Sequence, residues 1–557
     1  MNLQSVFDLT QICHLKGIKH AVISPGSRNA ALTIAFARHP EIKCFSVPDE
    51  RSAAFIALGM SLKTQIPTVL ICTSGSAALN YAPAVAEAYF NQIPLLILSA
   101  DRPPEWIGQR DGQTIFQENL FGKHVKQAFV FPSLLDDKNS VKLGHQSISS
   151  AIDISLTDEP GPVHINVPFR EPFYPTTADE YKFDTSLSTT ERKPESLIDW
   201  KQELDVLNQY KKVLIVAGQE RKDVEINQLL SQTSAEYQIP IVADIISNAH
   251  EVDRVITSQD VFLKNLENTD LQPDLLITLG MSVISKNLKL YLRQQKPKAH
   301  WHIRNETYAP NTYLSLTKHF KINSRHFLTE IKNRCSVSND QKNYYQAWQH
   351  IDTTTKSHIQ QFNNSTFSDL IAYKKVLNSL PSGSDLHLAN SMAVRYANVI
   401  GLNHNQDIEV YCNRGTSGID GSNSTAIGTA LMTDKTTFLL TGDMAFLYDR
   451  NAFWHNHLPE NLSIVVFNNH GGGIFRMIEG PSQQPELEEF FETRQQKDAK
   501  FLAKEFGYEY LPCHSIQDLE HHLMVFVKGE KRRILEIFTD AEESKQTFKE
   551  LFRNLPK

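Results

Sequence analysis

One pattern recurs along the whole sequence: a short run of aliphatic and β-branched residues, a turn rich in Gly, Ser, Pro or Asp, and a stretch with helical character. HAVIS, CFSV, TVLIC and LLILSA are such runs in the N-terminal part, and KVLIVAG, DLLITLG, TTFLLT and LSIVVF continue the pattern. Parallel strands cannot be joined by a tight turn, so a helix between successive strands is the usual crossover. The pattern therefore predicts an α/β protein built from doubly wound, mainly parallel sheets.

The length predicts more than one such sheet. The chain has 557 residues, whereas domains usually hold roughly 100–200. Two polar stretches, YPTTADEYKFDTSLSTTERKPES and CSVSNDQKNYYQAWQHIDTTTKS, interrupt the apolar pattern and are interpreted as linkers, the second with some helix. We therefore predict three α/β domains, at residues 1–185, 186–345 and 346–557.

The composition excludes several classes of protein. Lys plus Arg number 56 and Asp plus Glu 63, so the net charge of −7 lacks the basic excess of nucleic-acid-binding proteins. No run of about 18 apolar residues predicts a membrane span, and the N-terminus lacks the features of a secretory signal. The six cysteines form no CxxC pair, which favours free thiols in a reducing cytoplasm.

Two polar motifs follow neighbouring strands of the third predicted domain. TTFLLT ends in Gly442–Asp443, and LSIVVF ends in Asn468–Asn469, before a turn of three glycines. Their spacing fits one helical crossover, which would place both motifs at the carboxyl edge of a parallel sheet. A carboxylate, an amide oxygen and a backbone carbonyl supply half of the octahedral shell of Mg²⁺, and diphosphate oxygens and water would complete it. Each motif alone is also a common turn; their combination favours a cofactor site.

These motifs resemble the GDG…NN pattern of thiamine-diphosphate-dependent enzymes, with Met444 in place of the usual third glycine. The resemblance covers essentially the whole chain. It implies a pyrimidine-binding domain at 1–185, a central domain at 186–345 and a diphosphate-binding domain at 346–557. It also implies Mg²⁺ or Mn²⁺ held by Asp443, Asn469 and Gly471, with further cofactor contacts from Ile419, Gly472, Ile474 and Phe475.

Glu50 is the acid that the resemblance assigns to the aminopyrimidine ring. It follows a strand and begins a helical stretch in SVPDERSAAF. In the family, such a glutamate protonates the ring nitrogen so that the exocyclic imine can remove the thiazolium C2 proton. An ordinary acid at a helix N-terminus, favoured by the helix dipole, is the alternative for this residue taken alone, and Asp49 is the neighbour with which it could be confused.

A more specific resemblance rests on SPGSRNAALT, DERSAAF, TSGSAALNYAPAVAEA, SADRPPEW, NRGTSGIDG and NNHGGGIF. These phrases are similar to the 2-succinyl-5-enolpyruvyl-6-hydroxy-3-cyclohexene-1-carboxylate synthase family of menaquinone biosynthesis. Its members are transferases that decarboxylate 2-oxoglutarate and add the resulting succinyl carbanion equivalent to isochorismate.

Four arginines, Arg28, Arg102, Arg395 and Arg414, are suited to binding two dianionic substrates, because arginine binds carboxylates in a planar, bidentate way. By resemblance, 2-oxoglutarate contacts Ser391, Arg395 and Arg414, and isochorismate contacts Ser27, Arg28, Arg102, Gln113 and Lys286. Gln113 is also the catalytic candidate for proton or hydroxyl handling at the reacting carbon. Lys286 carries a departure, because the family often has an arginine at the position of Asn287; Lys289 is a candidate replacement. A surface ion pair is the alternative for each arginine alone.

The resemblance also implies a homodimer or homotetramer, with active sites formed between chains. Two other functions remain as alternatives. The first is another thiamine enzyme. An acetolactate-synthase-like enzyme would usually bind FAD in the central domain, where no GxGxxG fingerprint is present. A 2-oxoacid decarboxylase-like lyase would not need so many arginines. A non-catalytic protein on the same fold is less compatible with the presence of Glu50 and Asp443.

Overall fold

The computed structural model describes residues 3–132, 138–171, 173–174, 181–184, 200–265, 269–332, 337–404, 406–528, 531–553 and 555. Two compact units are distinguished. The first consists of Met1–Pro194, Asn413–Lys435 and Ala445–Leu462, and the second of Glu195–Cys412, Thr436–Met444 and Ser463–Lys557. The described residues form three sheets, one in the first unit and two in the second. The predicted α/β fold with three parallel-sheet domains is thereby confirmed.

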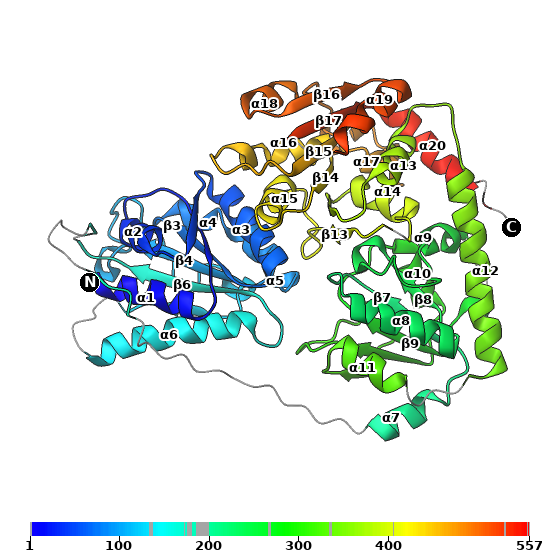
Figure 1. Ribbon diagram of the computed structural model, residues 1–557, viewed down its shortest axis with the longest axis horizontal. Coiled ribbons are helices and arrows are strands. Elements are labelled where there is room, and N and C mark those ends of the chain that lie inside the picture. Colours follow the sequence, from blue (N-terminus) through cyan, green and yellow to red (C-terminus); the bar gives the residue numbers. More distant parts are fainter. Residues whose placement is uncertain are drawn as a thin grey trace. The chain divides into compact units, whose positions relative to one another are not determined.

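The first unit contains a six-stranded sheet in the order β2-β1-β3-β4-β6-β5; β3, β4 and β6 are labelled in Figure 1. Its strands are β1 (His20–Ile23), β2 (Lys43–Ser46), β3 (Thr68–Cys72), β4 (Leu95–Asp101), β5 (Ala128–Val130) and β6 (Pro162–Pro168). Its helices include α1 (Gln4–Leu15), α2 (Ala30–Arg38), α3 (Glu50–Thr64), α4 (Ser76–Leu79), α5 (Ala82–Phe90) and α6 (Lys138–Leu156). Every residue of β3, β4 and β6 is buried, which explains the apolar sequence of β3 and the apolar start of β4.

Helix α15 (Ser422–Ala430) packs against α3 within the first unit. A methyl group on Gly428 would lie 2.0 Å from the Ile56 carbonyl oxygen, and one on Gly59 would lie 2.1 Å from the Thr425 carbonyl oxygen. Only glycine allows this close approach of the two backbones. The crossing explains why part of the third predicted domain forms a compact unit with residues of the first.

The second unit contains a five-stranded sheet, ordered β11-β10-β9-β7-β8, and a six-stranded sheet, ordered β13-β12-β14-β15-β17-β16. The five-stranded sheet comprises β7 (Val213–Ala217), β8 (Ile241–Ala243), β9 (Leu275–Leu279), β10 (Ala299–Ile303) and β11 (Lys318–Phe320). Its helices are α7 (Trp200–Leu207), α8 (Val224–Tyr237), α9 (Gln259–Phe262), α10 (Lys286–Gln294) and α11 (Ser324–Ile331).

The six-stranded sheet carries the motifs of the third predicted domain. Its strands are β12 (Asp385–Leu388), β13 (Glu409–Tyr411), β14 (Thr437–Gly442), β15 (Leu462–Asn468), β16 (Glu509–Cys513) and β17 (Arg533–Phe538). The helices connecting them include α13 (Asp369–Ser379), α14 (Met392–Ile400), α16 (Asp443–Tyr448), α17 (Ile474–Met477), α18 (Lys500–Glu505), α19 (Ile516–Phe526) and α20 (Ala541–Arg553). Because β14 and β15 are neighbours, the two polar motifs follow adjacent strands, as their spacing predicts.

The second predicted linker is largely helical, whereas the first lies mostly outside the described residues. Helix α12 (Asn339–Gln361) begins after Ser338, whose side chain accepts a hydrogen bond from the Gln341 N–H. Trp348 is fully buried and contacts the Phe262 ring edge to face. This segment is therefore a packed element of the second unit, in which even the polar residues Gln341, Asp352 and Thr355 are buried.

Candidate active site

Glu50 is the first residue of α3, as predicted, and its environment differs from that of Asp49. The Asp49 carboxylate accepts hydrogen bonds from the Ser52 N–H at 2.9 Å and from the Asn451 side chain at 2.8 Å. Glu50 has no ion pair among the described residues, and burial, assisted by the charge of Asp49, raises its pKa. Asp49 therefore caps the helix, and the half-buried Glu50 carboxylate is available to a ligand.

Two of the predicted substrate arginines lie beside Trp106. The Arg28 side chain is buried, donates to the Phe169 carbonyl at 3.3 Å and stands 4.4 Å from the Phe173 ring centre. Arg28 and Arg102 lie 5.9 and 6.0 Å from the Trp106 ring centre. A pair of guanidinium groups held by aromatic rings is suited to a planar dianion.

Gln113 and Ser27 lie in exposed turns of the same unit. Arg102 donates to the Gly112 carbonyl at 3.0 Å, which fixes the segment that carries Gln113. Gln113 itself adopts a φ of 57°, an unfavourable conformation for a residue with a side chain and one that is often found at functional sites. The structure thus brings Arg102 and the Gln113 segment together.

The segment that follows Arg414 is held by a buried glutamate that the sequence analysis did not identify. Glu87, on α5, is 1% exposed. One carboxylate oxygen accepts from the Gly415 N–H at 2.8 Å, and the other accepts from the Thr416 N–H at 2.6 Å and its hydroxyl at 2.7 Å. Burial raises the pKa of Glu87, and the hydrogen bonds from Thr416 and Gly415 oppose that rise. This carboxylate fixes the backbone directly after Arg414.

Ile419, the predicted aliphatic support of the cofactor, lies in the turn that leads into α15 and is 36% exposed. The start of α15 is held by Asp449, which accepts hydrogen bonds from the Ser424 N–H at 2.7 Å and hydroxyl at 2.9 Å. Burial raises the pKa of Asp449 to about 7. Ile419, Arg414 and Glu50 all belong to the first unit.

The predicted metal ligands Asp443 and Asn469 lie in the second unit, at the ends of β14 and β15. Asp443 is 3% exposed, and burial raises its pKa to about 7. One of its oxygens accepts from the Gln495 side chain at 2.7 Å. The Asn469 amide nitrogen donates to Asp369 at 3.0 Å. Its Oδ1 is buried and has no hydrogen-bond partner within the described part of the chain.

These residues fit a hard divalent cation. A carboxylate, an amide oxygen with no hydrogen-bond partner among the described residues, and the Gly471 carbonyl, which also accepts the Gly473 N–H at 3.0 Å, offer an all-oxygen set that suits Mg²⁺ or Mn²⁺. In the part of the chain that the structure describes, no group of three or more His, Cys, Asp or Glu side chains could hold a metal. The mixed set at Asp443, Asn469 and Gly471 is therefore the candidate metal centre.

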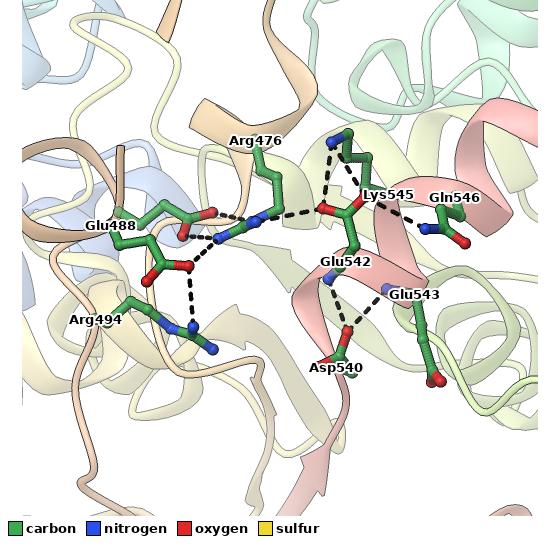
Figure 2. Close-up of polar contacts among 9 residues, drawn as sticks. Arg476, Glu488, Arg494, Asp540, Glu542, Glu543, Lys545 and Gln546 are labelled. Carbon is green, nitrogen blue, oxygen red and sulfur yellow. Dashed lines mark hydrogen bonds and ion pairs between the residues drawn. The ribbon is translucent and has the colours of Figure 1, made fainter. Parts of the chain in front are cut away.

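Residues 487–495 fold back over the glycine turn. The Gly472 N–H donates to the Glu492 carbonyl at 2.7 Å, and the ring of Phe475 lies 5.8 Å from that of Phe491. Figure 2 shows Arg476 between Glu488 and Glu542, with Arg494 on the far side of Glu488. Hydrogen bonds to Glu492 are the main cause of a raised Arg476 pKa. Arg476 thereby anchors this segment beside Gly471, Gly472, Ile474 and Phe475.

The remaining predicted contacts also lie in the second unit. Ser391 precedes α14 with a non-helical φ of 68°, and its backbone carbonyl accepts a hydrogen bond from the Arg395 side chain at 2.6 Å. Lys286 is exposed at the start of α10. The Asn287 side chain donates to the Asp260 carbonyl at 2.6 Å, and Lys289 donates to the Val283 carbonyl at 2.8 Å.

The structure thus divides the predicted residues between two units. The first holds Ser27, Arg28, Glu50, Arg102, Gln113, Arg414 and Ile419, and the second holds Lys286, Ser391, Arg395, Asp443, Asn469, Gly471, Gly472, Ile474 and Phe475. The sequence analysis missed Glu87, Asp369 and Gln495, because each acts on a motif residue from a distant part of the chain. Separately, among the described residues, no helix combines the length and apolar character of a membrane span.

Comparisons with known proteins agree with this geometry. Residues 7–125 match the model "Thiamine pyrophosphate enzyme, N-terminal TPP binding domain", and residues 184–388 match "Middle domain of thiamine pyrophosphate". Curated proteins named 2-succinyl-5-enolpyruvyl-6-hydroxy-3-cyclohexene-1-carboxylate synthase are similar over nearly their whole length. Those of Cytophaga hutchinsonii, Flavobacterium psychrophilum and Porphyromonas gingivalis are 44%, 40% and 36% identical, over 98% of this chain and 98%, 98% and 96% of their own. The chain therefore belongs to the 2-succinyl-5-enolpyruvyl-6-hydroxy-3-cyclohexene-1-carboxylate synthase family of thiamine-diphosphate-dependent enzymes.

Proposed function

We propose that this chain catalyses the decarboxylation of 2-oxoglutarate and the conjugate addition of the resulting four-carbon unit to isochorismate, with thiamine diphosphate and Mg²⁺ or Mn²⁺. The observation that carries this proposal is Glu50, a half-buried carboxylate with a raised pKa and no ion pair among the described residues. Membership of the synthase family supports the same reaction. When bound, thiamine diphosphate supplies the electron sink that lets carbon dioxide leave.

In this proposal, Glu50 holds a proton and Asp443 helps to bind the cation. Glu50 holds a proton at the ring nitrogen of the aminopyrimidine; a raised pKa favours that proton, because burial disfavours the charged form. Asp443, the Oδ1 of Asn469 and the carbonyl of Gly471 hold the cation that anchors the diphosphate. Gly472, Ile474, Phe475 and Ile419 supply the remaining cofactor contacts.

The cationic residues orient the two substrates. Arg395, Arg414 and Ser391 bind the carboxylates of 2-oxoglutarate. Arg28, Arg102, Ser27 and Lys286 bind isochorismate, and Gln113 handles a proton or hydroxyl at the reacting carbon. Charge matching of this kind orients the reactants and excludes water, which lowers the entropic cost of bond formation.

A product assay by mass spectrometry tests the reaction. The protein, with thiamine diphosphate and Mg²⁺, receives 2-oxoglutarate with or without isochorismate, and pyruvate serves as a competing donor. We expect carbon dioxide release and a succinyl adduct that depends on isochorismate. Glu50→Gln abolishes both, whereas Glu41→Gln, an exposed glutamate in the same unit, does not. Turnover of pyruvate but not of 2-oxoglutarate would refute the substrate assignment.

We also propose that the chain forms a homodimer or homotetramer with active sites between chains. Glu50 and Asp443 belong to different compact units, which is compatible with such sharing. Mixing the inactive variants Glu50→Gln and Asp443→Asn tests it, because a mixed dimer would contain one intact site. Recovery of activity supports shared sites, and its absence after subunit exchange contradicts them. The proposed compartment is a reducing cytoplasm, in keeping with the five free cysteines of the described residues.

A further inference from the structure

Asp369, the first residue of α13, contributes no atom to the proposed chemistry, yet both of its carboxylate oxygens are engaged. The residue is 3% exposed. Its Oδ1 accepts a hydrogen bond from the Thr539 hydroxyl at 2.5 Å, and its Oδ2 accepts one from the Asn469 side-chain nitrogen at 3.0 Å. Thr539 follows β17 and Asn469 follows β15, which are paired strands. Asp369 therefore bridges two strand ends at the edge of the sheet that carries the metal motifs.

The contact with Asp369 determines which end of the Asn469 amide is left for a ligand. An amide has a donor end and an acceptor end of almost the same shape, whereas an ionised carboxylate only accepts. The Asn469 nitrogen must therefore face Asp369, and Oδ1 must face away. That oxygen is buried without a hydrogen-bond partner in the described part of the chain. A buried oxygen in this state is unfavourable unless a ligand satisfies it.

We propose that Asp369 is a positioning residue that locks the Asn469 side chain with its oxygen toward the cation of the diphosphate site. This inference rests on the proposed function, and it assigns Asp369 no contact with the substrates. Outer-shell groups of this kind commonly fix the orientation of metal ligands.

The preceding residue provides an internal comparison. Asn468 also donates to a buried carboxylate, Glu536, at 2.8 Å. Its oxygen, however, already accepts the His470 N–H at 3.1 Å. Two adjacent asparagines thus make the same kind of amide–carboxylate bond, but only Asn469 keeps an oxygen for a ligand. A role in folding alone would account for Glu536. It would not explain why the buried Asn469 oxygen has no hydrogen-bond donor among the described residues.

The test compares Asp369→Asn with Glu536→Gln in the full-length protein. Asn at position 369 can present either end of its amide to Asn469, because the Thr539 hydroxyl can donate or accept. The orientation of Asn469 is then no longer enforced. The probe is Mn²⁺, titrated in the presence of thiamine diphosphate, with free Mn²⁺ measured by electron paramagnetic resonance. We expect the Mn²⁺ Kd of Asp369→Asn to rise about 10–100-fold, while Glu536→Gln keeps the wild-type Kd even if its unfolding temperature falls.

A wild-type Mn²⁺ Kd in folded Asp369→Asn would overturn this inference and leave the proposed function intact. Failure of the unmodified protein to bind Mn²⁺ with thiamine diphosphate would overturn both. If Asp369→Asn alone does not fold, the inference can still be tested by swapping the two side chains, so that position 369 carries Asn and position 469 carries Asp. Asn469→Asp alone places two carboxylates side by side, and adding Asp369→Asn restores a donor–acceptor pair with an oxygen toward the metal. The double variant should bind Mn²⁺ more tightly than Asn469→Asp, and equal or weaker binding contradicts the proposal.

Discussion

Replacing Glu87 by glutamine tests how the segment after Arg414 is held. Three donors, the N–H groups of Gly415 and Thr416 and the Thr416 hydroxyl, converge on the Glu87 carboxylate at 2.6–2.8 Å. A glutamine amide must turn its own NH₂ group toward at least one of them. This loses at least one hydrogen bond to a charged group, worth about 1.5–3 kcal/mol. The substitution also removes the cost of burying a charge, so we expect a net loss of about 2 kcal/mol.

The hydrogen bond lost in Glu87→Gln should affect both the stability of the first unit and the binding of 2-oxoglutarate. About 2 kcal/mol corresponds to an unfolding temperature lower by about 4–8 °C for a unit of this size. Displacement of Arg414 should raise the KM for 2-oxoglutarate about tenfold, which corresponds to about 1.4 kcal/mol of binding energy. The kcat should change much less, because Glu87 touches no reacting atom in the proposed mechanism.

Thermal unfolding and steady-state kinetics provide the measurement. Glu105→Gln is the matched control: Glu105 pairs with Arg170 in the same unit, and its side chain is 49% exposed, so its loss should leave both readouts near wild type. An unchanged unfolding temperature together with an unchanged KM in Glu87→Gln would refute the argument. A fall in kcat without a rise in KM would indicate that Glu87 acts on the chemical step instead.

Three further substitutions test other parts of the first unit. Gly428→Ala places a methyl group 2.0 Å from the Ile56 carbonyl oxygen, so calorimetry should show a loss of about 1–3 kcal/mol; equal or greater stability would mean that α3 and α15 separate freely. For Asp449, burial raises the folded-state pKa from 3.8 to about 7, so its stabilising contribution is present at acid pH and is lost as the pH rises through this range. Between about pH 5 and about pH 8, the unfolding temperature of Asp449→Asn should therefore fall less than that of the wild type. Parallel curves of unfolding temperature against pH for the two proteins would contradict this. Arg28→Lys loses the planar contact with Phe173, at 4.4 Å, and should raise the KM for isochorismate about tenfold; isochorismate-independent decarboxylation of 2-oxoglutarate should stay unchanged, and its loss would exclude the assigned role.

Most central strands were predictable because burial on both faces leaves an apolar run. The sequence analysis missed β6 (Pro162–Pro168), whose buried His164 and Asn166 hydrogen-bond to Ser99 and interrupt that run, and β16 (Glu509–Cys513). Three further strands that it missed lack the signal for similar reasons. β5 (Ala128–Val130) and β11 (Lys318–Phe320) are three-residue edge strands with partly exposed positions. β10 (Ala299–Ile303) includes His300 and His302, two buried residues whose rings hydrogen-bond to the Thr278 hydroxyl. These polar side chains break the apolar pattern by which a strand is recognised in the sequence, although tertiary contacts stabilise the strand.

The positions of Asp443 and Asn469 in the fold were also predictable, and here the reason is geometric. Asp443 and Asn469 follow adjacent parallel strands, so one crossover in the sequence places both at the same sheet edge. Glu50 was placed correctly at a helix start, but the sequence could not separate it from Asp49. Only the hydrogen bonds from Ser52 and Asn451 show that Asp49 is already engaged.

The positioning carboxylates could not be predicted, because their function depends on partners that no local pattern links to them. Asp369 lies 100 positions before Asn469, and Glu87 lies 329 positions before Thr416. Locally, Asp369 is an acid at a helix start, and Glu87 is a polar residue in an apolar helix. Burial gives them their role, since a buried carboxylate must be satisfied by donors and in turn fixes the orientation of those donors. In the proposed site, therefore, the ligand atoms come from short motifs, whereas single buried acids far away in the sequence fix their orientation. Substitutions of these acids should therefore change ligand affinity before they change the chemical step.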